Sequence, residues 1–222
     1  MNKYILFFAF CFTGFSLFAQ ADVNRIAAGA ETQVSTLLNS PAMVRPAVAT
    51  PLGRNWFRLE TDAHVFAEGI SARQVRDVFL DIENQERFFD GRRSKTSAAR
   101  VSQTETEAIV DYVSIGIVIG LQLRTPYRAV VRTVLDTETK MALDIRQTAQ
   151  DSESNSRIKN MVATRYAEDI TIGGKQYTYI RIYSIMDVDA SVLPGARGVL
   201  ERNSAPTNIE ALELTIAAAR LK

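Results

Sequence analysis

Few side chains in this sequence could carry out catalysis or bind a metal. Its 222 residues include one histidine, His64, and one cysteine, Cys11. Metal sites built on imidazole and thiolate need more ligands than these two residues supply. The chain also lacks the G-x-S-x-G, H-E-x-x-H and G-x-x-x-x-G-K-[ST] motifs of hydrolases, metalloproteases and nucleotide-binding loops. We therefore predict no catalytic residue, no metal and no cofactor, and any catalysis would have to use carboxylates, tyrosines or arginines.

His64 belongs to residues 56–66, in which apolar and polar side chains alternate. This pattern is typical of a β-strand with one face toward the core. His64 shares the polar side with Arg58, Glu60 and Asp62. We expect an exposed strand residue with no acid–base role.

Residues 176–187 form a second alternating stretch. One side carries three tyrosines and Arg181, and the other carries apolar residues such as Ile182 and Met186. If the tyrosines and Arg181 faced a cavity, they would provide polar anchors for an amphipathic ligand. The favoured interpretation is a surface ladder of Tyr and Arg, but the sequence leaves both orientations open.

Period-two alternation also selects candidate positions for an apolar cavity. In residues 141–147, Asp144 and Arg146 point outward, which leaves Leu143 and Ile145 inside. In residues 107–119 we expect the isoleucine side, which also holds Asp111, to face inward, unless a β-bulge reverses the two faces. The predicted ligand-binding residues are Phe79, Phe88, Ile115, Ile117, Val131, Leu143, Ile145, Tyr166, Ile182, Leu212 and Ile216.

The elements that would position these residues follow a simple order. After the strand at 56–66, Ser71 is a predicted N-cap for a helix that ends near Ile82, and residues 85–89 form a second short helix. Sequential, short-looped strands favour an antiparallel meander. Asn203 and Pro206 then predict the start of an amphipathic C-terminal helix. The six further strands are expected at 94–103, 107–119, 127–136, 141–148, 159–170 and 176–187.

The first 54 residues read as a targeting signal and an extension. Lys3 precedes an apolar run from residue 4 to residue 18, and Ala19-Gln20-Ala21 offers a signal-peptidase site with cleavage after Ala21. The expected organisation is a signal peptide at 1–21, an N-terminal extension and linker at 22–54, and one domain at 55–222. The expected location is the periplasm or the medium outside the cell.

The charge balance argues against a nucleic-acid partner. The chain has 26 basic and 25 acidic residues, and loss of Lys3 with the signal leaves 25 of each. Nucleic-acid-binding domains usually carry a basic face. The pair Arg92-Arg93 is better explained as a solvated turn than as a phosphate site.

The order of elements resembles the helix-grip fold of the START and polyketide cyclase-like (SRPBCC) superfamily. The likeness rests on residues 65–72 leading into the helix at 73–82, on residues 84–90, and on the approach to the last helix at 187–194. It implies an α+β fold in which a curved antiparallel sheet of about seven strands wraps around a long C-terminal helix. It also implies a cavity between sheet and helix for a lipid, a sterol- or hopanoid-like molecule or a quinone-like molecule.

Three functions follow as hypotheses. The first is an exported, non-catalytic protein that holds a hydrophobic small molecule and acts as a carrier with transient membrane contact. The second is a cyclase- or hydrolase-like enzyme acting on a hydrophobic substrate. The third is an interaction module that binds a protein partner through residues 22–54. The absence of catalytic motifs favours the first.

Overall fold

The structure is a computed structural model that describes residues 43–148 and 157–222. The predicted signal peptide, most of the predicted extension and residues 149–156, between two expected strands, lie outside these ranges. The elements are β1 (Met43–Gly53), β2 (Trp56–Ala67), α3 (Ala72–Leu80), the 3₁₀ helix η1 (Ile82–Asn84), α4 (Gln85–Phe88), β3 (Ser94–Gln103), β4 (Glu107–Val118), β5 (Leu121–Asp136), β6 (Lys140–Gln147), β7 (Ile158–Ile172), β8 (Lys175–Asp189) and α5 (Ala196–Ala219).

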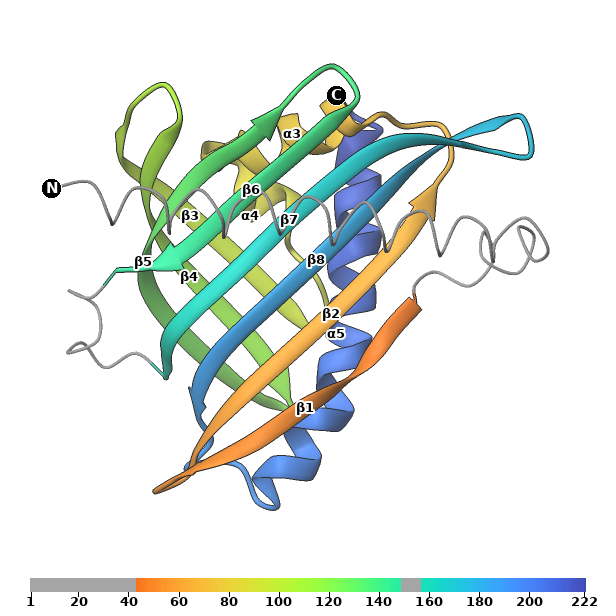
Figure 1. Ribbon diagram of the computed structural model, residues 1–222. Helices are drawn as coiled ribbons and strands as arrows, with labels where there is room; N and C mark the ends of the chain where they lie inside the picture. Colours follow the sequence, from red (N-terminus) through yellow and green to blue (C-terminus); the bar gives the residue numbers. More distant parts are fainter. Residues whose placement is uncertain (1–42, 149–156) are drawn as a thin grey trace, which may run out of the picture.

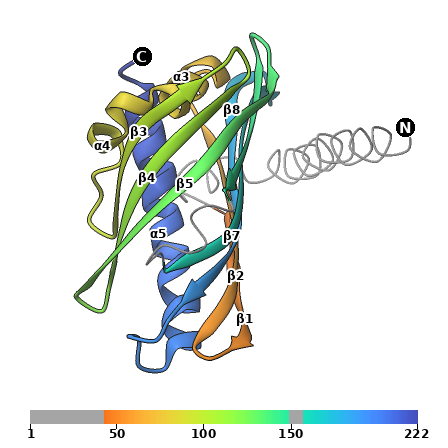
Figure 2. The ribbon, with the colours of Figure 1, turned by 90° about the vertical axis from the view of Figure 1, so that its left-hand side faces the viewer.

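A single curved sheet wraps around α5. Its order is β1-β2-β8-β7-β6-β5-β4-β3, and all neighbouring strands are antiparallel. The early strand β2 therefore lies beside the last strand, β8. Figures 1 and 2 show α5 crossing the concave side of the sheet, with α3 and α4 near one end of this helix. The α+β helix-grip prediction is confirmed, with eight strands in place of about seven.

The additional strand is β1, in a segment that we expected to be a linker before a domain starting at residue 55. It pairs with β2, and Ala47 and Ala49 pack against the N-terminal part of α5. Pro46 and Pro51 suggested a linker because proline lacks the N–H donor of a sheet ladder. At a sheet edge, however, proline is tolerated, and β1 is an edge strand. The sheet thus begins at Met43.

The C-terminal helix also begins earlier than predicted. α5 has 24 residues, starts at Ala196 and contains Pro206 in its interior. Asn203, Ser204 and Thr207 do not cap a helix start, because each side chain donates a hydrogen bond to the backbone carbonyl four residues earlier, at 2.6–2.8 Å. Such back-bonding allows polar residues within a helix. None of the helices in the described ranges is long and apolar enough to cross a membrane.

The start of α3 matches its prediction. The Gln74 backbone N–H donates to Ser71 Oγ at 3.3 Å, and the Ser71 backbone N–H donates to Gln74 Oε1 at 2.8 Å. This reciprocal pair is a capping box. The backbone N–H of Ala72 donates to Asp169 Oδ1 at 2.8 Å, which ties the helix start to β7.

The turn between β4 and β5 contains a strained residue. Ile119 has φ of 52° and is followed by Gly120 with φ of 76°, and the Ile119 side chain is 62% exposed. Positive φ at both positions suits Asn-Gly, whereas a β-branched residue is penalised there by roughly 1–2 kcal/mol. We expect Ile119→Asn to raise the free energy of unfolding by about 1 kcal/mol in urea denaturation.

Leu121→Asn is the matched control for this substitution. Leu121 is 46% exposed in the same hairpin, and its φ is not positive. An equal gain from both variants would mean that removal of exposed apolar surface is the cause. No gain from Ile119→Asn would show that the turn is unstrained.

Candidate functional site

A cavity of about 370 Å³ lies between the concave face of the sheet and α5. Its lining comes from all strands from β2 to β8, from α3 and α4, and from α5. Most of the lining side chains are apolar, such as Leu59, Met161 and Met186. The volume falls within the range of about 300–1,000 Å³ that is typical of small-molecule sites.

The structure brings six of the eleven predicted ligand-binding residues to this cavity and leaves five outside it. Leu212 is fully buried in the adjacent core with Phe88, and Ile216 packs against that core. Ile117 and Tyr166 are not part of the lining. The six lining residues are Phe79, Ile115, Val131, Leu143, Ile145 and Ile182.

The predicted orientation of β4 was wrong. Tyr112 faces the cavity, and its ring stacks on Tyr127 of β5 with 5.2 Å between centroids. Asp111 lies on the opposite side, where its carboxylate accepts hydrogen bonds from Arg128 at 2.6 and 2.8 Å. A carboxylate is more stable beside a half-exposed arginine than in an apolar cavity. The charge of Asp111 therefore determines which face of β4 lies toward the cavity. Ile115 nevertheless contributes to the lining.

On β8 the apolar side faces the cavity. Ile182, Ser184 and Met186 line it, while Arg181 lies on the outer face of the sheet and donates two hydrogen bonds to Asp62 at 2.8 and 2.9 Å. The tyrosines and Arg181 of β8 therefore lie on the outer face of the sheet, as the favoured interpretation predicted. This ladder is less exposed than expected, because the side chain of Arg181 is only 14% accessible.

Two other predictions fail on this outer face. Tyr166 points there, and its hydroxyl donates to the Glu168 carboxylate at 2.6 Å. His64, expected to be exposed, is 6% exposed, with its ring centroid 5.8 Å from that of Tyr179. His64 lies opposite Arg181 of β8 in the strand register, and its contact with the Tyr179 ring places it among the side chains of this face.

Sequence reasoning missed the main polar group inside the cavity, Arg165 of β7. It projects from the concave face, between Leu143 of β6 and Ile182 of β8 in the register. Its guanidinium carbon lies 5.9 Å from the ring centroid of Phe79. The sequence held one signal: Arg165 shares its parity with the small residues Ala163 and Ala167, which leave space beside a long side chain.

Burial alters the titration of this group and of its neighbours. It lowers the pKa of Arg165 and raises the pKa of Tyr112 and of Tyr127, against a smaller opposing effect of the Ser114 hydrogen bond on Tyr127. Arginine stays protonated at neutral pH even in such surroundings, and both phenols keep their protons. The cavity lining therefore places the cationic guanidinium of Arg165 near two neutral phenol groups.

Most other polar side chains of the lining are satisfied within the protein. The hydroxyl groups of Thr61 and Ser184 are 2.8 Å apart, and Thr215 donates to the carbonyl of Ala211 at 2.8 Å. Asn203, Ser204 and Thr207 bond to the helix backbone as described above. These groups present carbon atoms or satisfied hydroxyls to the cavity, which preserves its apolar character.

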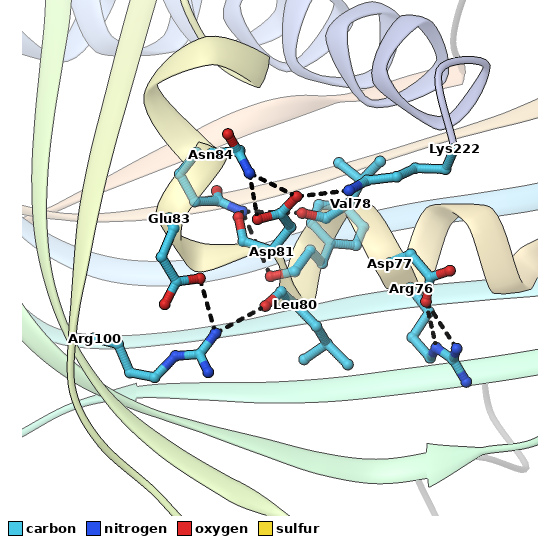
Figure 3. Close-up of polar contacts among 11 residues, drawn as sticks. Arg76, Asp77, Val78, Leu80, Asp81, Glu83, Asn84, Arg100 and Lys222 are labelled. Carbon is cyan, nitrogen blue, oxygen red and sulfur yellow. Dashed lines mark hydrogen bonds and ion pairs between the residues drawn. The ribbon is translucent and has the colours of Figure 1, made fainter.

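Polar contacts attach the α3–α4 segment to its neighbours. Asp81 accepts hydrogen bonds from Lys222 Nζ at 2.6 Å and from Asn84 Nδ2 at 2.8 Å (Figure 3). Arg100 of β3 donates to Glu83 at 3.0 Å on the other side of this segment (Figure 3). Lys222, just after α5, and strand β3 thus hold the segment that carries Phe79 and Phe89 against the cavity.

Glu210 makes a second connection between α5 and the sheet. Its carboxylate accepts hydrogen bonds from the backbone N–H groups of Arg92, Arg93 and Ser94 at 2.8, 2.8 and 3.2 Å. Three N–H donors directed at one carboxylate form a charge-assisted contact. This contact fixes the loop before β3 and the first residue of that strand, Ser94, against the middle of α5, and both Arg93 and Ser94 line the cavity.

The described residues provide little for metal chemistry or acid–base catalysis. No group of three or more His, Cys, Asp or Glu in residues 43–148 and 157–222 is placed to hold a metal ion. Asp189 is the one carboxylate among the described residues that line the cavity, and it lies 3.6 Å from Arg157. A pair of carboxylates or a carboxylate–histidine pair is not present in that lining.

No protein-family model and no curated protein sequence matches this chain. Its fold, however, is similar to solved structures. Human STARD10 matches with a TM-score of 0.52 at 10% identity, over 78% of this chain and 73% of that one. The STAR-related lipid transfer protein from Xanthomonas axonopodis (fragment 25-204) matches with a TM-score of 0.50 at 8% identity, over 79% and 99%. The protein TTHA0849 from Thermus thermophilus matches with a TM-score of 0.52 at 10% identity, over 72% and 96%. The fold is therefore START-like, as the resemblance implied.

Proposed function

We propose that this START-like protein binds a hydrophobic small molecule in the cavity between its sheet and α5. The observation that carries the proposal is the cavity itself, about 370 Å³ with a mainly apolar lining. An apolar space in a protein interior lacks the dispersion contacts of a packed core. A bound acyl, isoprenoid or polycyclic group would restore them and remove its own surface from water, at roughly 0.8 kcal/mol per CH₂.

We further propose a non-catalytic, exported carrier. The described residues of the lining offer neither a second carboxylate nor a histidine to pair with Asp189 as an acid–base couple, which favours binding over catalysis. The name of the Xanthomonas protein, a lipid transfer protein, fits a lipid as the ligand class. Export is a proposal from residues 1–21 of the sequence, and carriage across an aqueous compartment would give an exported lipid-binding protein a physical purpose.

Native mass spectrometry tests the proposal directly. The protein would be expressed with its own first 21 residues, purified without detergent and sprayed intact, after which any bound molecule would be extracted and identified. We expect a stoichiometric lipid or isoprenoid. A clean apo mass that does not change after incubation with membrane lipids would contradict the proposal. The same spectra would locate any cleavage after Ala21.

A further inference from the structure

We infer that the ligand is an anionic amphiphile whose carboxylate or phosphate group binds the guanidinium of Arg165 inside the cavity. The inference rests on the proposed function and specifies its ligand class. It requires that Arg165 be placed inside the cavity, that its charge lack a partner in the protein, and that the surroundings accept an anion.

Arg165 lies among apolar residues of the cavity lining. β7 lies near the middle of the sheet (Figure 1). Its residue Arg165 lines the cavity and lies between Leu143 and Ile182 in the strand register. Leu143 is 1% exposed and Ile182 is 6% exposed. The guanidinium carbon of Arg165 lies 5.9 Å from the centroid of the Phe79 ring. A charge placed among such neighbours has lost most of its hydration.

The charge of Arg165 has no carboxylate partner among the described residues. The one hydrogen bond that its guanidinium donates there goes to the backbone carbonyl of Thr164, at 3.1 Å. Guanidinium groups offer five N–H donors. Other arginines of the sheet, such as Arg128 and Arg181, have their guanidinium groups on carboxylates of adjacent strands. Arg165 is thus a half-buried cation on the cavity wall with donors to spare.

The groups around Arg165 suit an anion. Tyr112 and Tyr127 lie close enough to interact electrostatically with it, Ser114 forms a hydrogen bond with Tyr127, and all three residues line the cavity. Hydroxyl groups can donate to an oxyanion. The charged residues of the lining are Arg93, Arg157, Arg165 and Asp189, and Asp189 is next to Arg157. The cavity therefore has an excess of positive charge.

A neutral ligand and an anionic ligand would have different effects in this site. A sterol or quinone of suitable shape would cover Arg165 and leave its charge unpaired and dehydrated, which is unfavourable. A carboxylate or phosphate would accept two parallel N–H bonds from the planar guanidinium, and its tail would fill the apolar remainder. This difference selects molecules with a single anionic head and a hydrocarbon tail.

The test compares three probes with one tail length: hexadecanoate, hexadecyl phosphate and hexadecanol. Each would be titrated into delipidated protein at pH 8, with displacement of a fluorescent fatty acid as the readout. We expect hexadecanoate or hexadecyl phosphate to bind about 10- to 100-fold more tightly than the alcohol, because charge-assisted hydrogen bonds are lost with the alcohol. The ratio between the two anions identifies the head group as carboxylate or phosphate.

Two variants assign the preference to Arg165. In Arg165→Met, which keeps the length of the side chain, the anionic probes should lose about 10- to 100-fold in affinity while hexadecanol keeps its affinity. Arg146→Met is the control, since Arg146 on the next strand bonds to Asp144 and is half-exposed. This variant should bind all probes like the wild type.

The outcomes separate this inference from the proposed function. Equal binding of the alcohol and both anions by the wild type would overturn the inference and leave the hydrophobic site intact. A preference for anions that survives Arg165→Met would also overturn it. Failure of all three probes and of membrane lipids to bind would overturn both. The comparison of probes on wild-type protein stands even where Arg165→Met does not fold.

Discussion

Replacement of Asp62 by alanine is expected to lower the free energy of unfolding by about 3–5 kcal/mol, the range observed when one partner of a buried ion pair is removed. Asp62 and Arg181 are joined by two hydrogen bonds on the outer face of the sheet. Their side chains are 6% and 14% accessible, respectively. Loss of the carboxylate leaves the guanidinium partly dehydrated without this counter-charge. Urea denaturation monitored by circular dichroism would measure the effect.

Two comparisons make this prediction specific. The double variant Asp62→Leu with Arg181→Met replaces both charges with apolar groups, and it should recover most of the lost stability. Arg73→Ala removes an exposed pair with Glu138, in which the side chains are 56% and 83% accessible. It should change stability by less than about 1 kcal/mol. If Asp62→Ala lowers stability as little as Arg73→Ala does, the Asp62–Arg181 pair contributes no more to stability than an exposed ion pair.

The strands of this protein were predictable because local alternation and turn residues determine them. The strand expected at 94–103 coincides with β3, and Gly173-Gly174, a residue pair typical of tight turns, joins β7 to β8. These two glycines have φ of 56° and 79°, the positive values that a tight hairpin requires. Such signals lie within a few residues of one another and depend little on the rest of the fold.

Element ends and strand faces were harder to predict because tertiary contacts decide them. Pro206 read as a helix start, yet α5 continues through it, since packing against the sheet outweighs one missing hydrogen bond. In β4, Asp111 and the isoleucines share a parity, and local hydrophobicity favoured the isoleucines. Arg128, seventeen residues later in the chain, provides the partner that places Asp111 outside.

The candidate site was predictable only in its apolar part. Leu143 and Ile145 were assigned to the cavity from the outward preference of Asp144 and Arg146, and the structure places them there. Arg165 could not be assigned in this way, because hydrophobic alternation treats a charged residue as outward-facing. Its inward position contradicts local preference, and such contradictions are expected at functional sites.

The largest effect on ligand binding is expected from Ala163→Phe. Ala163 lies on β7 between Ile145 and Ser184 in the register, is 1% exposed and lines the cavity. A phenyl ring at this position would occupy the space proposed for the ligand. A ligand that loses about 100 Å² of apolar contact loses about 2.5 kcal/mol, which is roughly 70-fold in dissociation constant. Occupancy in native mass spectrometry and probe displacement would measure the loss.

Stability and a neighbouring residue distinguish a ligand site from a packed core. Inserting a large side chain into a well-packed interior costs typically 1–3 kcal/mol, whereas a true cavity should accept the ring at a cost below about 1 kcal/mol. Val162→Phe is the matched control, because Val162 precedes Ala163 and is 36% exposed. It should leave ligand binding unchanged. If Ala163→Phe retains full ligand occupancy at wild-type stability, the ligand binds elsewhere. If Ala163→Phe unfolds the protein and Val162→Phe does not, the space is filled by the protein's own side chains.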